Sequence, residues 1–328
     1  MNTNIKETRL DSYIAEKYRI SRVLSKELIE CNTFKVLHDN TELHQSKIKP
    51  SLKMYNLERY FVEPFDSLSF TVKVNNQITK NNIIPLANDK IDIKVLFEDQ
   101  YLAVIEKPAG ISTHSNFDDN QPSLVNGLIS LFGFENLAKT QDPLRSGIVH
   151  RLDKNTSGLM LIAKTEESLT ALQAIFKERK IKKCYKAICY GVPRIIAGVI
   201  DTGIEKSKND RTKMTISNSL SSKQAITHYK LNKVLADGLL SVIDCRIDTG
   251  RTHQIRVHLT HLGNSVVGDE TYGVKNDKWL ETRFAKYPET LLQIKSLNRH
   301  LLHANHLSFV HPFLLTNLSF DSKLPFCI

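Results

Sequence analysis

The segment 147–164, GIVHRLDKNTSGLMLIAK, gathers side chains whose types and spacing could do chemistry. Asp153 lies between Arg151 and Lys154, and the apolar run 159–163 that follows reads as a buried strand. A loop anchored to a stiff strand can hold its side chains in one geometry, which suits a functional carboxylate. The same residues also fit a solvated turn stabilised by its aspartate. Taken by itself, the segment therefore leaves both interpretations open.

A second polar segment follows a strand predicted at 241–247. There the sequence DTGRTHQIRVH, residues 248–258, runs from a turn into a helix that Gly263 is expected to end. Ile255 falls on the apolar face of that helix and Arg256 on another face, while Arg251 precedes it. These cations could make surface ion pairs or contact an anion, since either use fits a basic helix start.

A third candidate, Tyr185, lies in a strand predicted at 182–190 and shares a face with Ala187 and Cys189. Without further information, Tyr185 is an ordinary half-buried strand aromatic.

These segments are parts of one larger pattern. The run EDQYLAVIEKPAGISTH (98–114), the HRLD sequence (150–153), KCYKAICYG (183–191), TGRTHQIRVH (249–258), GDETYG (268–273) and LLHANHLSFVHP (301–312) follow one another in order. Together they resemble the RluA-type RNA pseudouridine synthases over roughly residues 96–325. The polar segment 275–298 is longer than the usual connector of that family.

The resemblance implies a reaction and three catalytic residues. In this family an aspartate at the position of Asp153 is catalytic, and the arginine matching Arg256 pairs with it. The residue matching Tyr185 packs against the target base and takes part in proton transfer. Uridine isomerisation exchanges no electrons and no phosphate, so we expect no metal, redox cofactor or nucleotide cofactor; the sequence has neither a P-loop nor a dinucleotide-binding glycine motif.

The resemblance also implies substrate contacts. Ile255 matches an apolar residue that lines the family's pocket, and Arg151 matches an arginine that fills the place of the extruded base. The planar guanidinium of Arg151 can stack on a base and form hydrogen bonds at the same time. Lys154 and Arg251 are candidate contacts to phosphates.

The N-terminal segment predicts a separate small domain. Helices are expected at 9–17 and 21–30, followed by short strands, and the pattern is similar to the S-four-type RNA-binding domain of many RluA-type enzymes. We therefore expect an S-four-type α/β RNA-binding domain at 1–80, with its end between Pro64 and Asn88, and a catalytic domain at 90–328. The fold class expected for the catalytic domain is α+β, with a mixed, mostly antiparallel sheet and flanking helices.

Bulk composition agrees with a globular protein that binds a polyanion. The 328 residues include 45 Lys and Arg against 35 Asp and Glu, a formal charge of +10, with 41% hydrophobic residues. The five cysteines are scattered singly with no C-x-x-C pair, so a zinc site is not expected. No apolar run approaches the roughly 20 residues of a membrane span, and no signal sequence is recognisable, so we expect a cytoplasmic protein. We also expect it to be a monomer.

Two functional hypotheses follow. The first is an enzyme that converts specific uridines to pseudouridine in structured RNA, with large-subunit ribosomal RNA favoured over tRNA by the N-terminal domain. The second is a non-catalytic RNA-binding or ribosome-assembly protein on the same scaffold. A pure binder has no need of the Asp153 carboxylate, which favours the enzyme.

Overall fold

The computed structural model describes residues 7–17, 22–30, 34–55, 60–64, 85–114, 122–140 and 142–326. The chain divides into two compact units, Met1–Ile83 and Ile84–Ile328, and each has an apolar core of its own. The domain end predicted between Pro64 and Asn88 falls mostly on residues 65–84, which lie outside the described residues.

The N-terminal unit is a small α/β structure built around one apolar core. Its helices are α1 (Leu10–Lys17) and α2 (Arg22–Glu30); the residue at 21, predicted as the start of α2, lies outside the described residues. The strands are β1 (Glu7–Arg9), β2 (Phe34–His38), β3 (Thr41–Glu42), β4 (Lys53–Tyr55) and β5 (Tyr60–Pro64). Strand β2 lies between β3 and β5, and β1 pairs with β4. Leu10, Ile14, Phe34, Val36 and Met54 are fully buried in the core.

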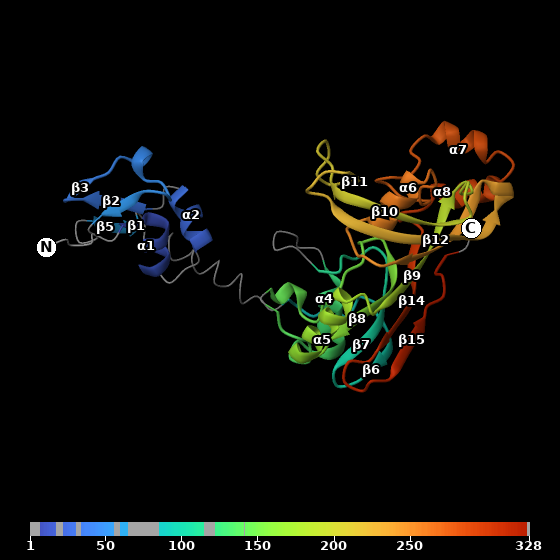
Figure 1. Cartoon of the computed structure of the whole chain (residues 1–328), viewed down its shortest axis with the longest axis horizontal. Helices are drawn as coiled ribbons and strands as arrows, with labels where there is room; N and C mark the ends of the chain where they lie inside the picture. The colour runs from blue at the N-terminus through green and yellow to red at the C-terminus, as the bar shows by residue number, and fades with distance from the viewer. Residues whose placement is uncertain are drawn as a thin grey trace. The chain divides into compact units, whose positions relative to one another are not determined.

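The larger unit contains a ten-stranded sheet (Figure 1). Its strands are β6 (Lys94–Glu98), β7 (Leu102–Lys107), β8 (Ser157–Ala163), β9 (Lys182–Tyr190), β10 (Ala197–Lys206), β11 (Met214–Ile216), β12 (Lys223–Leu235), β13 (Leu240–Ile247), β14 (Leu302–Val310) and β15 (Asn317–Asp321). The order is β11-β10-β12-β13-β9-β14-β8-β7-β6, with β15 paired to β14. Among the named strands, only the β14–β8 pairing is parallel, so the prediction of a mostly antiparallel mixed sheet is confirmed.

Strand β14 joins two halves of this sheet, β6–β8 and β9–β13, and the strands of each half are consecutive in the sequence. It pairs with β9 on one side and with β8 on the other, where His303 lies opposite Ser157 and Ala304 opposite Gly158. Gly158 has a φ of +119°, and a Cβ built on it would lie 2.2 Å from the carbonyl oxygen of Ala304. This close approach of two backbones requires glycine at the start of β8.

Helices cover both faces of the sheet. They are α4 (Leu124–Phe132), α5 (Glu166–Lys177), α6 (Gln254–His261), α7 (Asp277–Arg283) and α8 (Pro288–Lys295). Successive residues of a strand point to opposite faces, and β8 accordingly sends Met160 into one core cluster, with α4 and α6, and Leu161 into another, with α5. Thr165 is the N-cap of α5, and its side chain accepts a hydrogen bond from the Ser168 N–H.

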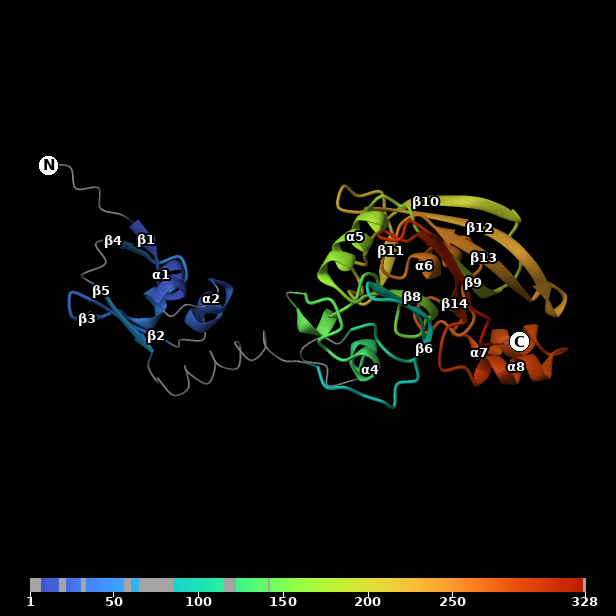
Figure 2. The same ribbon diagram turned by 90° about the horizontal axis from the view of Figure 1, so that it is seen from below.

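The long connector at 275–298 folds into α7 and α8. Leu280 of α7, Phe284 directly after α7 and Ile294 of α8 pack with Ile188 and Tyr190 of β9. Figures 1 and 2 show both helices away from α4 and α5. Within the described residues, no helix has the length and apolar character needed to cross a membrane.

Candidate active site

The loop that carries Asp153 is pinned by the segment after β7. The Leu152 N–H donates to the Thr113 hydroxyl at 3.2 Å, and that hydroxyl donates to the Leu152 carbonyl at 2.9 Å. On the other side of Asp153, the Lys154 carbonyl accepts hydrogen bonds from the Gly110 N–H at 2.9 Å and from the buried Lys107 ammonium at 3.1 Å. Both backbone neighbours of the aspartate are therefore fixed by residues of the EKPAGIST run.

The C-terminal end of the loop is fixed from a distant part of the sequence. The Thr156 N–H donates to the Asp153 carbonyl at 3.1 Å, and the Thr156 hydroxyl is hydrogen-bonded to His300 Nε2 at 2.7 Å. Burial, and then the charge of Arg256, lower the pKa of His300 to about 4. His300 is thus neutral at physiological pH and contributes a hydrogen bond rather than a charge.

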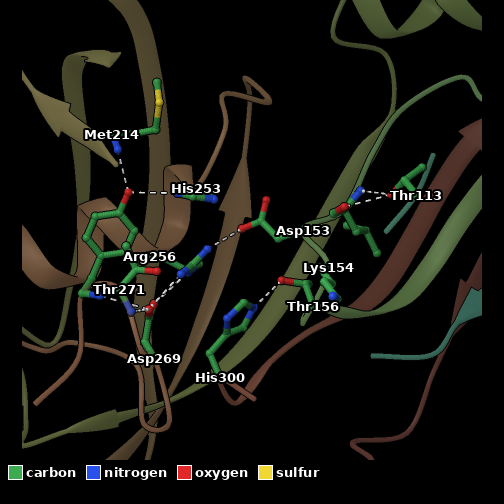
Figure 3. Close-up of polar contacts among 12 residues, drawn as sticks. Thr113, Asp153, Lys154, Thr156, Met214, His253, Arg256, Asp269, Thr271 and His300 are labelled. Atoms are coloured by element: carbon green, nitrogen blue, oxygen red, sulfur yellow. Dashed lines mark hydrogen bonds and ion pairs between the residues drawn. The ribbon is translucent and has the colours of Figure 1, made fainter. Parts of the chain in front are cut away.

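Arg256 of α6 lies between two carboxylates (Figure 3). Its Nη1 is 3.1 Å from Asp153 Oδ2, while Nε and Nη2 donate to the two oxygens of Asp269 at 2.7 and 2.8 Å. Asp269 Oδ1 also accepts from the backbone N–H groups of Thr271 and Tyr272. Because a bidentate pair fixes the plane of the guanidinium, Asp269 determines where Arg256 presents its remaining N–H to Asp153.

The three charged groups are largely removed from water. The side chains of Asp153, Arg256 and Asp269 are 18%, 7% and 0% exposed. Burial by itself lowers the pKa of Arg256, but the hydrogen bonds and charge of Asp269 outweigh it and raise the pKa above its usual value. Arg256 is therefore a permanent cation 3.1 Å from Asp153. Among the described residues no donor contacts Asp153 Oδ1, so one oxygen remains available.

Asp153 opens into a cavity of about 530 Å³ whose lining combines apolar and polar side chains. Leu152, Tyr185, Ile247, Ile255 and Leu302 line it together with Asp153 and Arg256. Tyr185 lies across from Cys245 in the β9–β13 pair, and Ile255 projects from the first turn of α6. A flat, partly polar ring would have apolar contacts here and a carboxylate at its edge.

Tyr185 is buried at the wall of this cavity. Burial, followed by the negative charge of Asp153, raises the pKa of Tyr185 well above its usual range, so the phenol keeps its proton. Within the described part of the chain, no protein group is hydrogen-bonded to the Tyr185 hydroxyl. A hydroxyl at a cavity wall without a protein partner is available to a bound ligand.

A second cavity, of about 390 Å³, meets the first at Asp153. Its lining is polar and includes Lys154, Arg145 and His300, whereas Arg151, Asp153 and Arg256 line both cavities. Arg251 lines only the first. The side chains of Arg151, Lys154 and Arg251 are exposed, as expected of groups that would meet a large ligand.

Sequence reasoning assigned no role to several residues that build this site. Asp269 and Tyr272 lie in the GDETYG motif, and Lys107 in the EKPAG motif. The Tyr272 hydroxyl accepts from the Met214 N–H at 2.7 Å and is hydrogen-bonded to His253 Nδ1 at 2.9 Å, while its ring lies 5.1 Å from the Arg256 guanidinium carbon. The motifs marked these positions, but only the folded chain shows what they contact.

The site contains no cluster of metal ligands. In the parts of the chain that the structure describes, no group of three or more His, Cys, Asp or Glu side chains is arranged to hold a metal ion.

Comparisons with known proteins agree with this architecture. A family model described as RNA pseudouridylate synthase matches residues 101–261. The chain is 38% identical over 248 residues to "Ribosomal large subunit pseudouridine synthase D" of Zymomonas mobilis, covering 74% of this chain and 73% of that relative. It is 34% identical to the protein of the same name from Buchnera aphidicola, covering 97% of this chain and 91% of the relative.

Among solved structures, the chain is similar to "Human RNA Pseudouridylate Synthase Domain Containing 4". The TM-score is 0.53 and the identity 27%, covering 71% of this chain and 88% of the human one. With its sheet, its relatives and its matched motifs, the chain belongs to the RNA pseudouridylate synthase family and is an isomerase that acts on RNA.

Proposed function

We propose that this enzyme isomerises specific uridines of large-subunit ribosomal RNA, with Asp153 as its catalytic carboxylate. The observation that carries the proposal is the 3.1 Å contact between Asp153 and Arg256 at the wall of a cavity lined by Tyr185 and Ile255. Asp153 and Arg256 are 103 positions apart in the sequence, and the contact buries both charges. A buried ion pair is weak evidence for a purely stabilising role, which favours a functional one.

The choice of ribosomal RNA rests on the names of the relatives. Those from Zymomonas and Buchnera are named as synthases of the large ribosomal subunit, and the second aligns with nearly the whole chain. The similarity of the N-terminal unit to S-four-type RNA-binding domains supports the same substrate class. Because these relatives are bacterial, we infer that the enzyme acts in the cytoplasm, and we also propose that it acts as a monomer.

The reaction breaks the bond between uracil N1 and ribose C1′ and forms one between C5 and C1′. The proton on C5 is lost and N1 gains one, so substrate and product are isomers. Asp153 is the group placed to attack the sugar, to attack the base or to remove a sugar proton, through the oxygen that Arg256 leaves free. Tyr185 is assigned to pack against the base and to take part in the proton transfer.

A uridine cannot react while it is stacked in RNA, so the target must be extruded at a cost of a few kcal/mol. The first cavity, whose lining includes Leu152, Ile255 and Leu302, is assigned to the extruded base, and the second, polar cavity to the RNA around it. Arg151, which lines both, is assigned to the place that the base leaves. Lys154 and Arg251 are assigned to phosphates on the two sides.

The test is Asp153→Asn in the full chain. The substitution keeps the side-chain shape, and Arg256 keeps its pairing with Asp269, so folding and RNA affinity should be retained. The rate of pseudouridine formation should fall at least about 1,000-fold. Pseudouridines are mapped in the ribosomal RNA of cells in which the native gene is deleted and replaced by either the wild-type gene or the Asp153→Asn variant. Asp244→Asn, which removes an aspartate from a surface ion pair with Lys186, is the matched control.

Other results would point elsewhere. Wild-type turnover by Asp153→Asn would remove Asp153 from the chemistry. A wild-type protein that binds ribosomal RNA but forms no pseudouridine would support the non-catalytic RNA-binding alternative. Loss of pseudouridine from tRNA alone would make the enzyme a tRNA synthase.

A further inference from the structure

The lining of the first cavity contains four cations besides Arg151 and Arg256. They are Lys177 and Arg179 from the end of α5, Lys183 from β9, and Arg251 from the loop after β13. Arg251 was recognised in the sequence as a candidate phosphate contact, whereas the other three were not. We call these four residues the cationic wall.

Lys183 stands closest to the reacting groups along the sheet. It is two positions before Tyr185 on the same face of β9, so their Cα atoms are about 7 Å apart. Its ammonium lies 5.2 Å from the centre of the Phe176 ring. Burial lowers the pKa of Lys183 to about 8, although the charge of Asp248 opposes the shift. Among the described residues no carboxylate forms an ion pair with it.

Arg179 occupies a strained backbone position. It follows the last turn of α5 with a φ of +58°, and the N–H groups of Arg179 and Lys180 donate to the carbonyls of Phe176 and Ile175. This is the left-handed helix ending that normally selects glycine. A residue with a side chain is disfavoured in this conformation, and such strain is typically retained for a function. No partner contacts the Arg179 side chain in the described parts of the chain.

Arg251 is held in place without being neutralised. Its Nε donates to the Gln224 carbonyl at 2.9 Å, and its backbone N–H donates to Gln254 Oε1 at 3.0 Å. These bonds orient the guanidinium at the cavity. As with the rest of the cationic wall, no carboxylate of the described residues pairs with it.

The carboxylates of the cavity are already engaged. Its lining contains two, Asp153 and Asp248. Asp153 is paired with Arg256, and Asp248 lies 2.8 Å from His228 and 3.3 Å from Arg246. Lys177, Arg179 and Arg251 are exposed and Lys183 is half-buried, so the cationic wall presents uncompensated positive charge along the cavity. An anionic group of the ligand would compensate that charge, and in RNA that group is a backbone phosphate.

We propose that Lys177, Arg179, Lys183 and Arg251 form a subsite for the backbone phosphate of a nucleotide adjoining the target uridine. This inference rests on the proposed function of the same cavity and adds to it the path of the RNA strand. The strand enters past the end of α5, its phosphate lies on the cationic wall, and the target base reaches Tyr185 and Asp153.

Two substitutions test the subsite because each should relieve strain or an unpaired buried charge. Arg179→Gly places glycine where the backbone favours it. Lys183→Met keeps the length and apolar stem of the side chain and removes its charge. Lys180→Ala is the matched control, since Lys180 lies beside Arg179, is 68% exposed, pairs with Glu178 and does not line the cavity.

Affinity of the full chain for an unmodified transcript of large-subunit ribosomal RNA is measured across a range of salt concentrations. Arg179→Gly and Lys183→Met should each weaken binding about fivefold or more, and should each reduce the slope of log affinity against log salt by about one. The melting temperature of both variants should be no lower than that of wild type. Lys180→Ala should match wild type in affinity and slope.

The proposal is overturned if Arg179→Gly and Lys183→Met keep wild-type affinity and slope, or if Lys180→Ala loses as much as they do. If one variant melts at a lower temperature than wild type, the RNA affinity and salt slope of the other variant still test the subsite. Pseudouridine formation by the wild-type protein in the same transcript is followed in parallel. Its absence would count against the proposed function, whereas its presence together with unchanged slopes would count against the subsite alone.

Discussion

At the scale of single residues, the ion pair between Asp153 and Arg256 depends on a second carboxylate, Asp269, which lines neither cavity. Asp269 holds Arg256 by two hydrogen bonds, and Arg256 in turn holds Asp153. Asp269→Asn should therefore lower kcat at least tenfold while leaving RNA affinity unchanged, because the guanidinium loses its orientation but the cavity surface does not change. The free energy of unfolding should fall by on the order of 3 kcal/mol, since a buried cation loses its partner. Single-turnover kinetics and denaturant titration measure both quantities.

The control for Asp269→Asn is again Asp244→Asn, because the Asp244–Lys186 pair is partly exposed. It should cost less than about 1 kcal/mol and leave kcat unchanged. If Asp269→Asn lost stability but kept its kcat, the role of Asp269 would be structural only.

At the scale of secondary structure, the position of the Asp153 loop depends on how closely β8 approaches β14. Gly158→Ala would place a Cβ 2.2 Å from the Ala304 carbonyl oxygen at a φ of +119°. We expect a loss of at least about 2 kcal/mol in the free energy of unfolding, together with a lower rate of pseudouridine formation, because the strands must separate where the loop begins.

Gly263→Ala separates the steric effect at Gly158 from simple backbone strain. Gly263 also has a positive φ, +86°, but a Cβ there would meet nothing within 4 Å. Gly263→Ala should lower the free energy of unfolding by about 1 kcal/mol, which is the cost of the backbone strain alone. Equal losses in the two variants, measured by denaturant titration, would show that the close approach to Ala304 is unimportant.

At the scale of the whole molecule, each of the two units has its own apolar core. A chain of residues 84–328 should therefore fold alone with the melting temperature of the larger unit unchanged. Its affinity for ribosomal RNA should fall about tenfold, because a second RNA-binding unit raises the effective concentration of the first. Its kcat at saturating RNA should stay within about twofold of the full chain.

Binding of the same RNA by residues 1–83 alone is the companion measurement, and weak binding is expected. If residues 84–328 bound as tightly as the full chain, the N-terminal unit would not be an RNA-binding domain for this substrate.

Much of the fold could be predicted because local signals were strong. The apolar run 159–163 falls within β8, and the strands predicted at 182–190 and 241–247 are β9 and β13. Helix ends are harder to predict: α5 ends at Lys177, and Arg179 beyond it adopts the left-handed conformation despite having a side chain. Nothing in the residue type of arginine predicts that choice.

The candidate site was only partly accessible to sequence reasoning. Motifs drew attention to Asp153, Tyr185 and Arg256, but the cationic wall assembles from α5, β9 and the loop after β13, whose residues follow no shared pattern. Likewise, nothing in the sequence around Asp269 indicates that it forms a bidentate ion pair with Arg256. Contacts between segments far apart in sequence are decided by packing, which periodicity does not record.

The place of β14 in the sheet has a consequence for how the enzyme is made on the ribosome. Residues 157–163 and 182–190 leave the exit tunnel early, yet β8 and β9 are joined only through residues 302–310. The nascent chain thus carries both halves of its reaction centre, unjoined, until residues 302–310 have been synthesised. A chain truncated before residue 302 should therefore lack the pairing that joins the two halves, and should form no pseudouridine.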